Sequence, residues 1–270
     1  GDETYKDIQK FERVKYKQDL DFNTVKVCAL IEYYENVPCP VAFRAVNYEW
    51  SLGGFLSHFG FKQIRMSGVD KAKAIALLSG GKREDLFPGE ERIIIPLPDE
   101  LRNYIKEYEE HKGEEGYKID PYAKYPHLEL RDLCKKAMEV ISDGDEKTCI
   151  MMNIANPDMV GHTADIMACI TAMEKVDQAV QRISLATLKK KGIVFITADH
   201  GNIEEKITED GEPSTFHTRA KVPFIILGAG DIPLREDGTL RDVAPTLLFF
   251  ALGYEHEKVK EVFPGKILLK

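Results

Sequence analysis

Several features that would assign this 270-residue sequence to a common protein class are missing from it. Its five cysteines form no Cys-x-x-Cys pair, and this odd, scattered set predicts reduced thiols in a cytoplasmic protein. No apolar run approaches the ~18 residues of a membrane span, and the first residues lack the pattern of a signal peptide. The net charge of −8 offers no attraction to a nucleic acid or an acidic membrane. We therefore predict neither partner, and we expect local positive charge to hold any anionic substrate.

The residues that are present predict strands and helices in alternation. The composition, with 43% hydrophobic and 30% charged residues, is that of an ordinary globular protein. Apolar, β-prone runs predict strands at 25–31, 62–66, 92–95, 148–154, 193–197 and 222–227. Helical spacing of apolar residues predicts helices at 51–59, 72–78, 130–141, 165–191 and 243–251. This alternation indicates an α/β fold, with a mainly parallel sheet covered by helices on both faces.

Two stretches differ from this pattern. Residues 1–23 are charged, dotted with aromatic residues and weakly periodic, which predicts connecting material. Residues 99–126 are rich in Glu, Lys and Tyr and contain few residues suited to a core. We interpret this second stretch as a surface helix or an insertion.

An acid–histidine pair follows the predicted strand 148–154. The Asn156-Pro157 step breaks the strand, so Asp158 and His162 lie where the sheet ends. A separation of four residues places both side chains on one face of a helical turn. Carboxylate oxygens and imidazole nitrogens are ligands of hard and borderline divalent metals. The pair is therefore a candidate for metal binding.

A second pair and a further histidine follow in the same half of the chain. Asp199 and His200 come directly after the strand 193–197, and Gly201 permits the turn that both side chains need to point the same way. His217 follows a polar loop and precedes the strand 222–227. Each residue alone could be an ordinary cap, turn residue or buried histidine. Because ligands gather beyond the carboxyl ends of strands in open α/β sheets, the five together favour a metal centre.

The strings that contain these residues resemble the cofactor-independent phosphoglycerate mutases, a family of the alkaline phosphatase superfamily. They are Asn-Pro-Asp-Met-Val-Gly-His-Thr at 156–163, Thr-Ala-Asp-His-Gly-Asn at 197–202 and His-Thr at 217–218. Further likeness lies at 40–43, 61–65, 87–92 and 242–246, so the resemblance extends from about residue 38 to the end. Phosphopentomutases share the Asp-His and His-Thr elements, but the string at 156–163 points to the glycerate enzymes.

The resemblance implies a reaction and a set of metal ligands. The family interconverts 3- and 2-phosphoglycerate through a phosphoserine intermediate at two divalent ions, which would be Mn²⁺ in the first place, with Mg²⁺, Co²⁺ or Zn²⁺ as alternatives. Positions matching Asp158, His162 and His217 hold one ion, and those matching Asp199 and His200 hold the other. The resemblance further implies a small phosphorylated substrate and a monomeric complete protein.

A lysine is implied as well, at Lys71. Its position in the family contacts the phosphoryl group that is transferred. The residues around Lys71 match the family poorly, so a solvated lysine at a helix end stays open as an alternative.

The sequence also departs from the family. The second metal of the family needs an Asp from an N-terminal strand, and the nucleophile is a Ser on a following turn; neither motif is present. The nearest look-alike, Ser79, matches a position that is not the nucleophile. The inserted transferase domain that binds substrate is missing too, and residues 1–37 are interpreted as a connecting segment and possible remnant of it. Residues 38–270 are then the metal-binding, phosphatase-type domain, which corresponds to the C-terminal half of the enzyme.

Three hypotheses about function remain. In the first, the chain is the metal-bearing half of this glycolytic isomerase, inactive alone because its nucleophilic Ser lies outside the chain. In the second, it is a stand-alone metal-dependent phosphatase in which a metal-bound water is the nucleophile. In the third, it is a non-catalytic fragment or binding module that holds metal weakly or not at all.

Overall fold

The computed structural model of the chain describes residues 28–31, 39–43, 49–80 and 85–270, without the side chains of 77–80. The chain divides into two compact units, 1–47 and 48–270. In the first unit, β1 (Ala29–Ile31) pairs in parallel with β2 (Val41–Phe43). The start of the predicted strand 25–31 and the predicted boundary at residue 37 lie outside the described residues.

A parallel sheet forms the centre of the second unit. Its strand order is β4 (Glu90–Ile95), β3 (Lys62–Gly68), β5 (Thr148–Met152), and Met66 of β3 is in register with both Ile93 and Met152. The strands β6 (Val194–Thr197) and β7 (Phe224–Leu227) form a separate antiparallel pair. The predicted α/β class with a mainly parallel sheet is therefore confirmed, with an antiparallel pair added to it.

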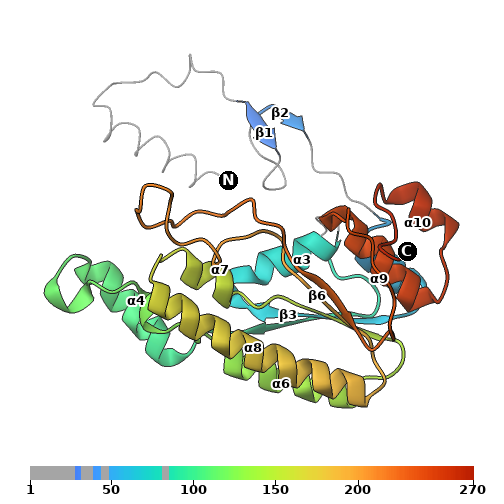
Figure 1. Cartoon of the computed structure of the whole chain (residues 1–270), viewed down its shortest axis with the longest axis horizontal. Helices are drawn as coiled ribbons and strands as arrows, with labels where there is room; N and C mark the ends of the chain where they lie inside the picture. Colours follow the sequence, from blue (N-terminus) through green and yellow to red (C-terminus); the bar gives the residue numbers. More distant parts are fainter. Residues whose placement is uncertain (1–27, 32–38, 44–48, 81–84) are drawn as a thin grey trace. The chain divides into compact units, whose positions relative to one another are not determined.

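Helices cover both faces of this sheet, as the sequence predicts. Figure 1 shows α6 and α8 side by side on one face of β3 and β6, and α3 on the other. The helices are α2 (Leu52–His58), α3 (Ala72–Gly80), α4 (Asp99–His111), α5 (Pro121–Lys124), α6 (Leu130–Asp143), α7 (Asn156–Gly161), α8 (Ile166–Lys189), α9 (Val243–Leu252) and α10 (Glu257–Val262). The described residues also form the short 3₁₀ helices η1 (Val69–Lys71), η2 (Glu115–Tyr117) and η3 (Leu240–Asp242). None of the described helices is long and apolar enough to cross a bilayer.

The core explains why α6 lies on the sheet. Leu133 and Ala137 of α6 pack against Ile64 and Met66 of β3, and all four are buried. Burial of a Leu, Ile or Met side chain stabilises the fold by about 1.5–3 kcal/mol. Because the strands are parallel, this packing brings the carboxyl ends of β3 and β5 to the same edge of the sheet, where the candidate residues follow.

The helix predicted at 165–191 is α8, but its apolar pattern is only half buried. Asp165 caps its first turn by accepting a hydrogen bond from the Ala168 amide. Val176 packs against α6, whereas Ile166, Ile170 and Met173 are 46%, 48% and 40% exposed. The first half of α8 therefore leaves an apolar face uncovered by the described residues.

The segment 99–126 contains the predicted surface helix, α4, and it also contributes buried side chains. Leu101 is fully buried and Tyr104 is 6% exposed, so part of this segment is shielded from solvent. Leu101 clusters with Leu97 and Leu128, and Met159 of α7 packs against this cluster. The segment therefore supports the helix that carries Asp158, a role that its many Glu and Lys residues concealed in the sequence.

Candidate metal centre

The short helix α7 places the first acid–histidine pair. Pro157 lies in its first turn, where the missing amide proton of proline costs nothing. The buried Asn156 fixes the start of the helix by donating from its amide to the Pro126 carbonyl, at 2.9 Å. Asp158 and His162 then lie one turn apart, as predicted, with the Asp158 Oδ1 atom 3.2 Å from His162 Nε2.

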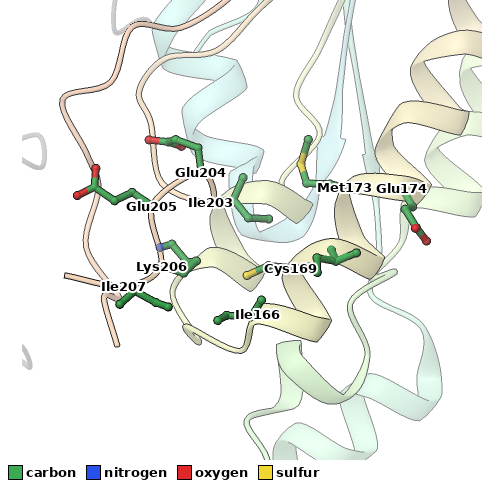
Figure 2. A pocket seen from close by; sticks show the side chains of 10 residues that line it. Ile166, Cys169, Met173, Glu174, Ile203, Glu204, Glu205, Lys206 and Ile207 are labelled. Atoms are coloured by element: carbon green, nitrogen blue, oxygen red, sulfur yellow. The ribbon is translucent and has the colours of Figure 1, made fainter. Parts of the chain in front are cut away.

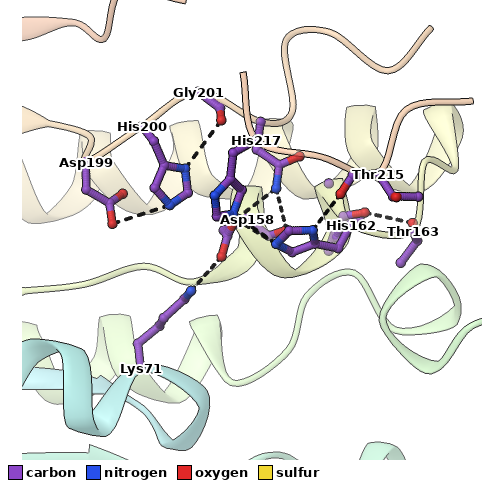
Figure 3. A network of polar contacts seen from close by, with 12 residues as sticks. Lys71, Asp158, His162, Thr163, Asp199, His200, Gly201, Thr215 and His217 are labelled. Atoms are coloured by element: carbon purple, nitrogen blue, oxygen red, sulfur yellow. Dashed lines mark hydrogen bonds and ion pairs between the residues drawn. The ribbon is translucent and has the colours of Figure 1, made fainter. Parts of the chain in front are cut away.

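His217 joins this pair from a distant part of the chain. Its Nε2 atom is 3.0 Å from Asp158 Oδ1 and 3.1 Å from His162 Nε2 (Figure 3). One oxygen and two nitrogens thus lie within 4.8 Å of one another, and among the described residues this is the only group of at least three acidic, His or Cys side chains so close. His217 lies 59 positions after Asp158 and 55 positions after His162, so the fold brings together residues that are far apart in the sequence.

The ring of His162 is oriented by the backbone. Its Nδ1 atom lies 2.7 Å from the Thr215 carbonyl oxygen, which can only accept a hydrogen bond. Nδ1 therefore carries the proton, and in the neutral ring Nε2 keeps a lone pair directed at Asp158 and His217. Metal-binding histidines in proteins are oriented in this manner.

The second predicted pair lies directly beside the first. The His200 ring stacks on the His217 ring at 3.7 Å between centroids, with 22° between the planes. Asp199 Oδ2 is 3.5 Å from His200 Nε2 (Figure 3). A bridge between Gly201 and Thr218 joins the two loops, with the Thr218 amide donating to the Gly201 carbonyl at 2.8 Å. The structure therefore brings all five predicted residues together, and their role as ligands remains a prediction.

Lys71 approaches Asp158 from η1, on the other side of the carboxylate (Figure 3). Its Nζ atom donates to Asp158 Oδ2 at 2.5 Å, and the two side chains are 24% and 15% exposed. This ion pair contradicts the alternative of a freely solvated lysine. The two carboxylate oxygens thus have different partners, Lys71 at Oδ2 and the histidines at Oδ1.

The surroundings keep Asp158 ionised. Burial alone would raise the pKa of its carboxyl, but hydrogen bonds from Lys71 and Asn202 outweigh burial and hold the pKa at about 2. The charge of Lys71 acts in the same direction, and so would the charge of a protonated His162 ring. An anionic oxygen is therefore present at neutral pH without a bound metal.

Residues after His200 form a supporting layer that the sequence interpretation missed. The Asn202 amide donates to Asp158 Oδ1 at 2.8 Å and to the Asp158 carbonyl at 3.1 Å. Glu204 accepts from the Asn202 backbone amide at 2.8 Å and from the Thr218 hydroxyl, so it ties both ligand-bearing loops together. Asn202 adjoins the Asp-His pair, which was the available signal. Glu204 gave none, because charged residues in a polar loop are usually solvated.

The donor set fits a divalent ion. A carboxylate oxygen and two imidazole nitrogens suit Mn²⁺, Co²⁺ and Zn²⁺, and three protein ligands leave coordination positions open to a substrate. Asp199 and His200 offer a second oxygen and nitrogen next to this set. Such an arrangement can bind a phosphorylated molecule and stabilise charge on it.

Comparisons with known proteins identify relatives of this chain. The profile of the Metalloenzyme superfamily matches residues 42–252. A 2,3-bisphosphoglycerate-independent phosphoglycerate mutase from Moorella thermoacetica is 37% identical over 248 residues, which are 90% of this chain and 42% of that protein. The chain thus spans less than half the length of this relative.

A solved structure shows the same fold. A crystal structure of Leishmania mexicana phosphoglycerate mutase at low cobalt concentration superposes on this chain with a TM-score of 0.71 and 21% sequence identity. The match covers 96% of this chain and 47% of the Leishmania chain. At this identity the likeness shows the fold alone, and it confirms the predicted alkaline-phosphatase-like architecture.

Proposed function

The chain belongs to the Metalloenzyme superfamily, and from this premise we propose that it is the metal-bearing part of a 2,3-bisphosphoglycerate-independent phosphoglycerate mutase. The proposed reaction interconverts 3- and 2-phosphoglycerate through a phosphoserine intermediate, with the serine outside this chain. The observation that carries the proposal is the convergence of Asp158, His162 and His217 within 4.8 Å. A cytoplasmic location and a monomeric complete protein belong to the same proposal.

Two sets of residues would hold two divalent ions, with Mn²⁺ the first candidate. Asp158, His162 and His217 would hold one ion, and Asp199 with His200 would hold the other together with ligands from outside the chain. Because only the first set offers three ligands, we expect it to bind metal more tightly. When bound, the ions supply positive charge that neutralises the phosphoryl group and the oxygens that attack and leave.

The chain's own side chains prepare the site for this chemistry. Asp158 stays deprotonated, and Thr215 holds the His162 ring with its Nε2 lone pair available. An ammonium group has three donors, and the bond to Asp158 uses one donor of Lys71. We propose that the others bind oxygens of the transferring phosphoryl group. A point charge at this position favours an anionic phosphorylated acid as the substrate.

Assays of the chain alone and with a serine-bearing partner test the proposal. With Mn²⁺ and 3-phosphoglycerate, we expect no isomerisation by this chain alone, as followed by ³¹P NMR. Addition of the N-terminal part of the Moorella relative, which this chain does not match, is expected to produce 2-phosphoglycerate. Asp158→Asn in this chain is expected to remove that activity.

The same assays separate the alternatives. Mn²⁺-dependent hydrolysis of p-nitrophenyl phosphate by the chain alone, lost in Asp158→Asn, would favour a stand-alone phosphatase. Metal uptake without turnover, both by the chain alone and with the N-terminal part of the Moorella relative added, would favour a binding module.

A further inference from the structure

A buried lysine lies behind the metal centre, and the function proposed above gives it no role. Lys206 is 7% exposed, and its Nζ atom donates to the Gly161 carbonyl at 2.9 Å and to Asn202 Oδ1 at 2.5 Å. Figure 2 shows it beside Ile203 on one wall of a cavity, with Cys169 of α8 nearby. Both of these acceptors are neutral oxygens, and no ion pair joins Lys206 to a carboxylate among the residues that the structure describes. Burying an ammonium group without a carboxylate partner costs free energy. We therefore expect Lys206 to have a function that offsets this cost.

The contact with Lys206 determines which way the Asn202 amide faces. An ammonium group can only donate, so the Asn202 atom that faces it must be the oxygen. The Asn202 NH₂ group then points in the opposite direction, at Asp158. If the amide were reversed, its oxygen would face the carboxylate oxygen of Asp158 and repel it. Lys206 therefore fixes the donor that holds Asp158 Oδ1 in place.

The packing leaves this amide little room for another position. Asn202 is 4% exposed, and a side chain at Gly161 would place its Cβ 2.6 Å from Asn202 Oδ1. Gly161 thus gives the amide space beside α7, and Lys206 also binds the Gly161 carbonyl. The lysine contacts both the helix that carries Asp158 and ends directly before His162, and the side chain that orients Asp158.

We propose that Lys206 is a positioning residue that sets metal affinity through Asn202, by holding the Asp158 carboxylate in the geometry that binds the ion. The inference rests on the metal centre of the proposed function. The positive charge of the Lys206 ammonium has the opposite effect on metal affinity, because it repels the metal ion. The two effects predict different signs: loss of positioning weakens metal binding, whereas loss of repulsion strengthens it.

A double-mutant cycle tests the proposal by measuring the Mn²⁺ dissociation constant by titration calorimetry. Lys206→Met keeps the length of the stem and removes the donor, and we expect about a 10-fold weaker affinity, the lower end of the effect of losing an outer-shell partner. Asn202→Ala is expected to weaken binding at least as much. In the Asn202→Ala background, Lys206→Met is expected to add no further loss. Lys175→Met, at an exposed position of α8, is the control and should bind like the wild type.

The outcomes separate this inference from the proposed function. If the wild type takes up no Mn²⁺, or His162→Ala takes up as much, the metal centre itself is wrong. If the wild type binds at the centre while Lys206→Met binds as tightly or more tightly, or the two losses simply add, the role of Lys206 is wrong. Should Lys206→Met lose its cooperative thermal transition, Lys206→Gln takes its place in the cycle, since glutamine is too short to reach both oxygens.

Discussion

Asp158→Asn is expected to lower the affinity of the chain for Mn²⁺ by more than about 100-fold, because losing a direct ligand should cost more than losing an outer-shell partner, which costs about 10- to 100-fold. Asparagine has nearly the same shape but no charge, so the ion loses its only anionic ligand in the three-residue set. The substitution also leaves Lys71 without the carboxylate that it contacts at 2.5 Å, and an unneutralised ammonium then repels the ion. Titration calorimetry measures the change directly.

A matched control separates this effect from a general loss of negative charge. Asp143→Asn removes a carboxylate from the exposed end of α6 and should leave the dissociation constant unchanged. Wild-type Mn²⁺ affinity in Asp158→Asn, with the fold intact by circular dichroism, would show that the ion binds elsewhere.

Glu129→Gln is expected to change how stability depends on pH. Glu129 precedes α6, is 2% exposed, and its Oε2 atom has no hydrogen-bond partner among the described residues. The carboxylate lies against Gly68, where even a Cβ atom would fall 3.0 Å or less from both carboxylate oxygens. Burial raises the pKa of Glu129 to about 7; a backbone hydrogen bond lowers it, and the charge of Asp70 raises it.

The direction of the effect follows from proton linkage. The unfolded chain releases this proton near pH 4.5, whereas the folded protein keeps it until about pH 7. Between these values the folded state binds more protons, so the free energy of unfolding falls as the pH rises, by about 3 kcal/mol in all. Glutamine does not titrate, so Glu129→Gln should gain about 3 kcal/mol relative to the wild type between about pH 4.5 and 8.

Urea unfolding at a series of pH values tests this expectation. Glu139→Gln, at an exposed position of α6, is the control and should follow the wild-type profile. Parallel pH profiles for Glu129→Gln and the wild type would mean that Glu129 is ionised in the folded protein at pH 5.

Local patterns were enough to predict most of the elements of this fold. The apolar run at 62–66 is part of β3, and the periodic stretch 165–191 contains α8, because periodicity and terminal signals are properties of neighbouring residues. Tertiary contacts were not predictable in the same way. Nothing near Leu101 indicates that it meets Leu97 and Leu128, and the antiparallel pairing of β6 with β7 depends on the path of the chain between them.

The candidate site, like the fold, was predictable from the sequence only in part. Asp158 and His162 follow one predicted strand and His217 precedes another, and these places at strand ends indicated that the three residues could meet at one edge of the sheet. The contact of Lys71 with Asp158 needs the exact path of η1, which has no sequence signature. Lys206 was missed because a lysine in the stretch Ile-Glu-Glu-Lys is normally solvated, and only the packed structure shows that it is buried.

Anomalous diffraction from crystals of the chain grown with Mn²⁺ tests the central claim most directly. The account predicts a strong manganese peak bonded to Asp158 Oδ1, His162 Nε2 and His217 Nε2, with any second, weaker peak at Asp199 and His200. Manganese bound elsewhere, with Asp158, His162 and His217 still in direct contact with one another, would contradict it.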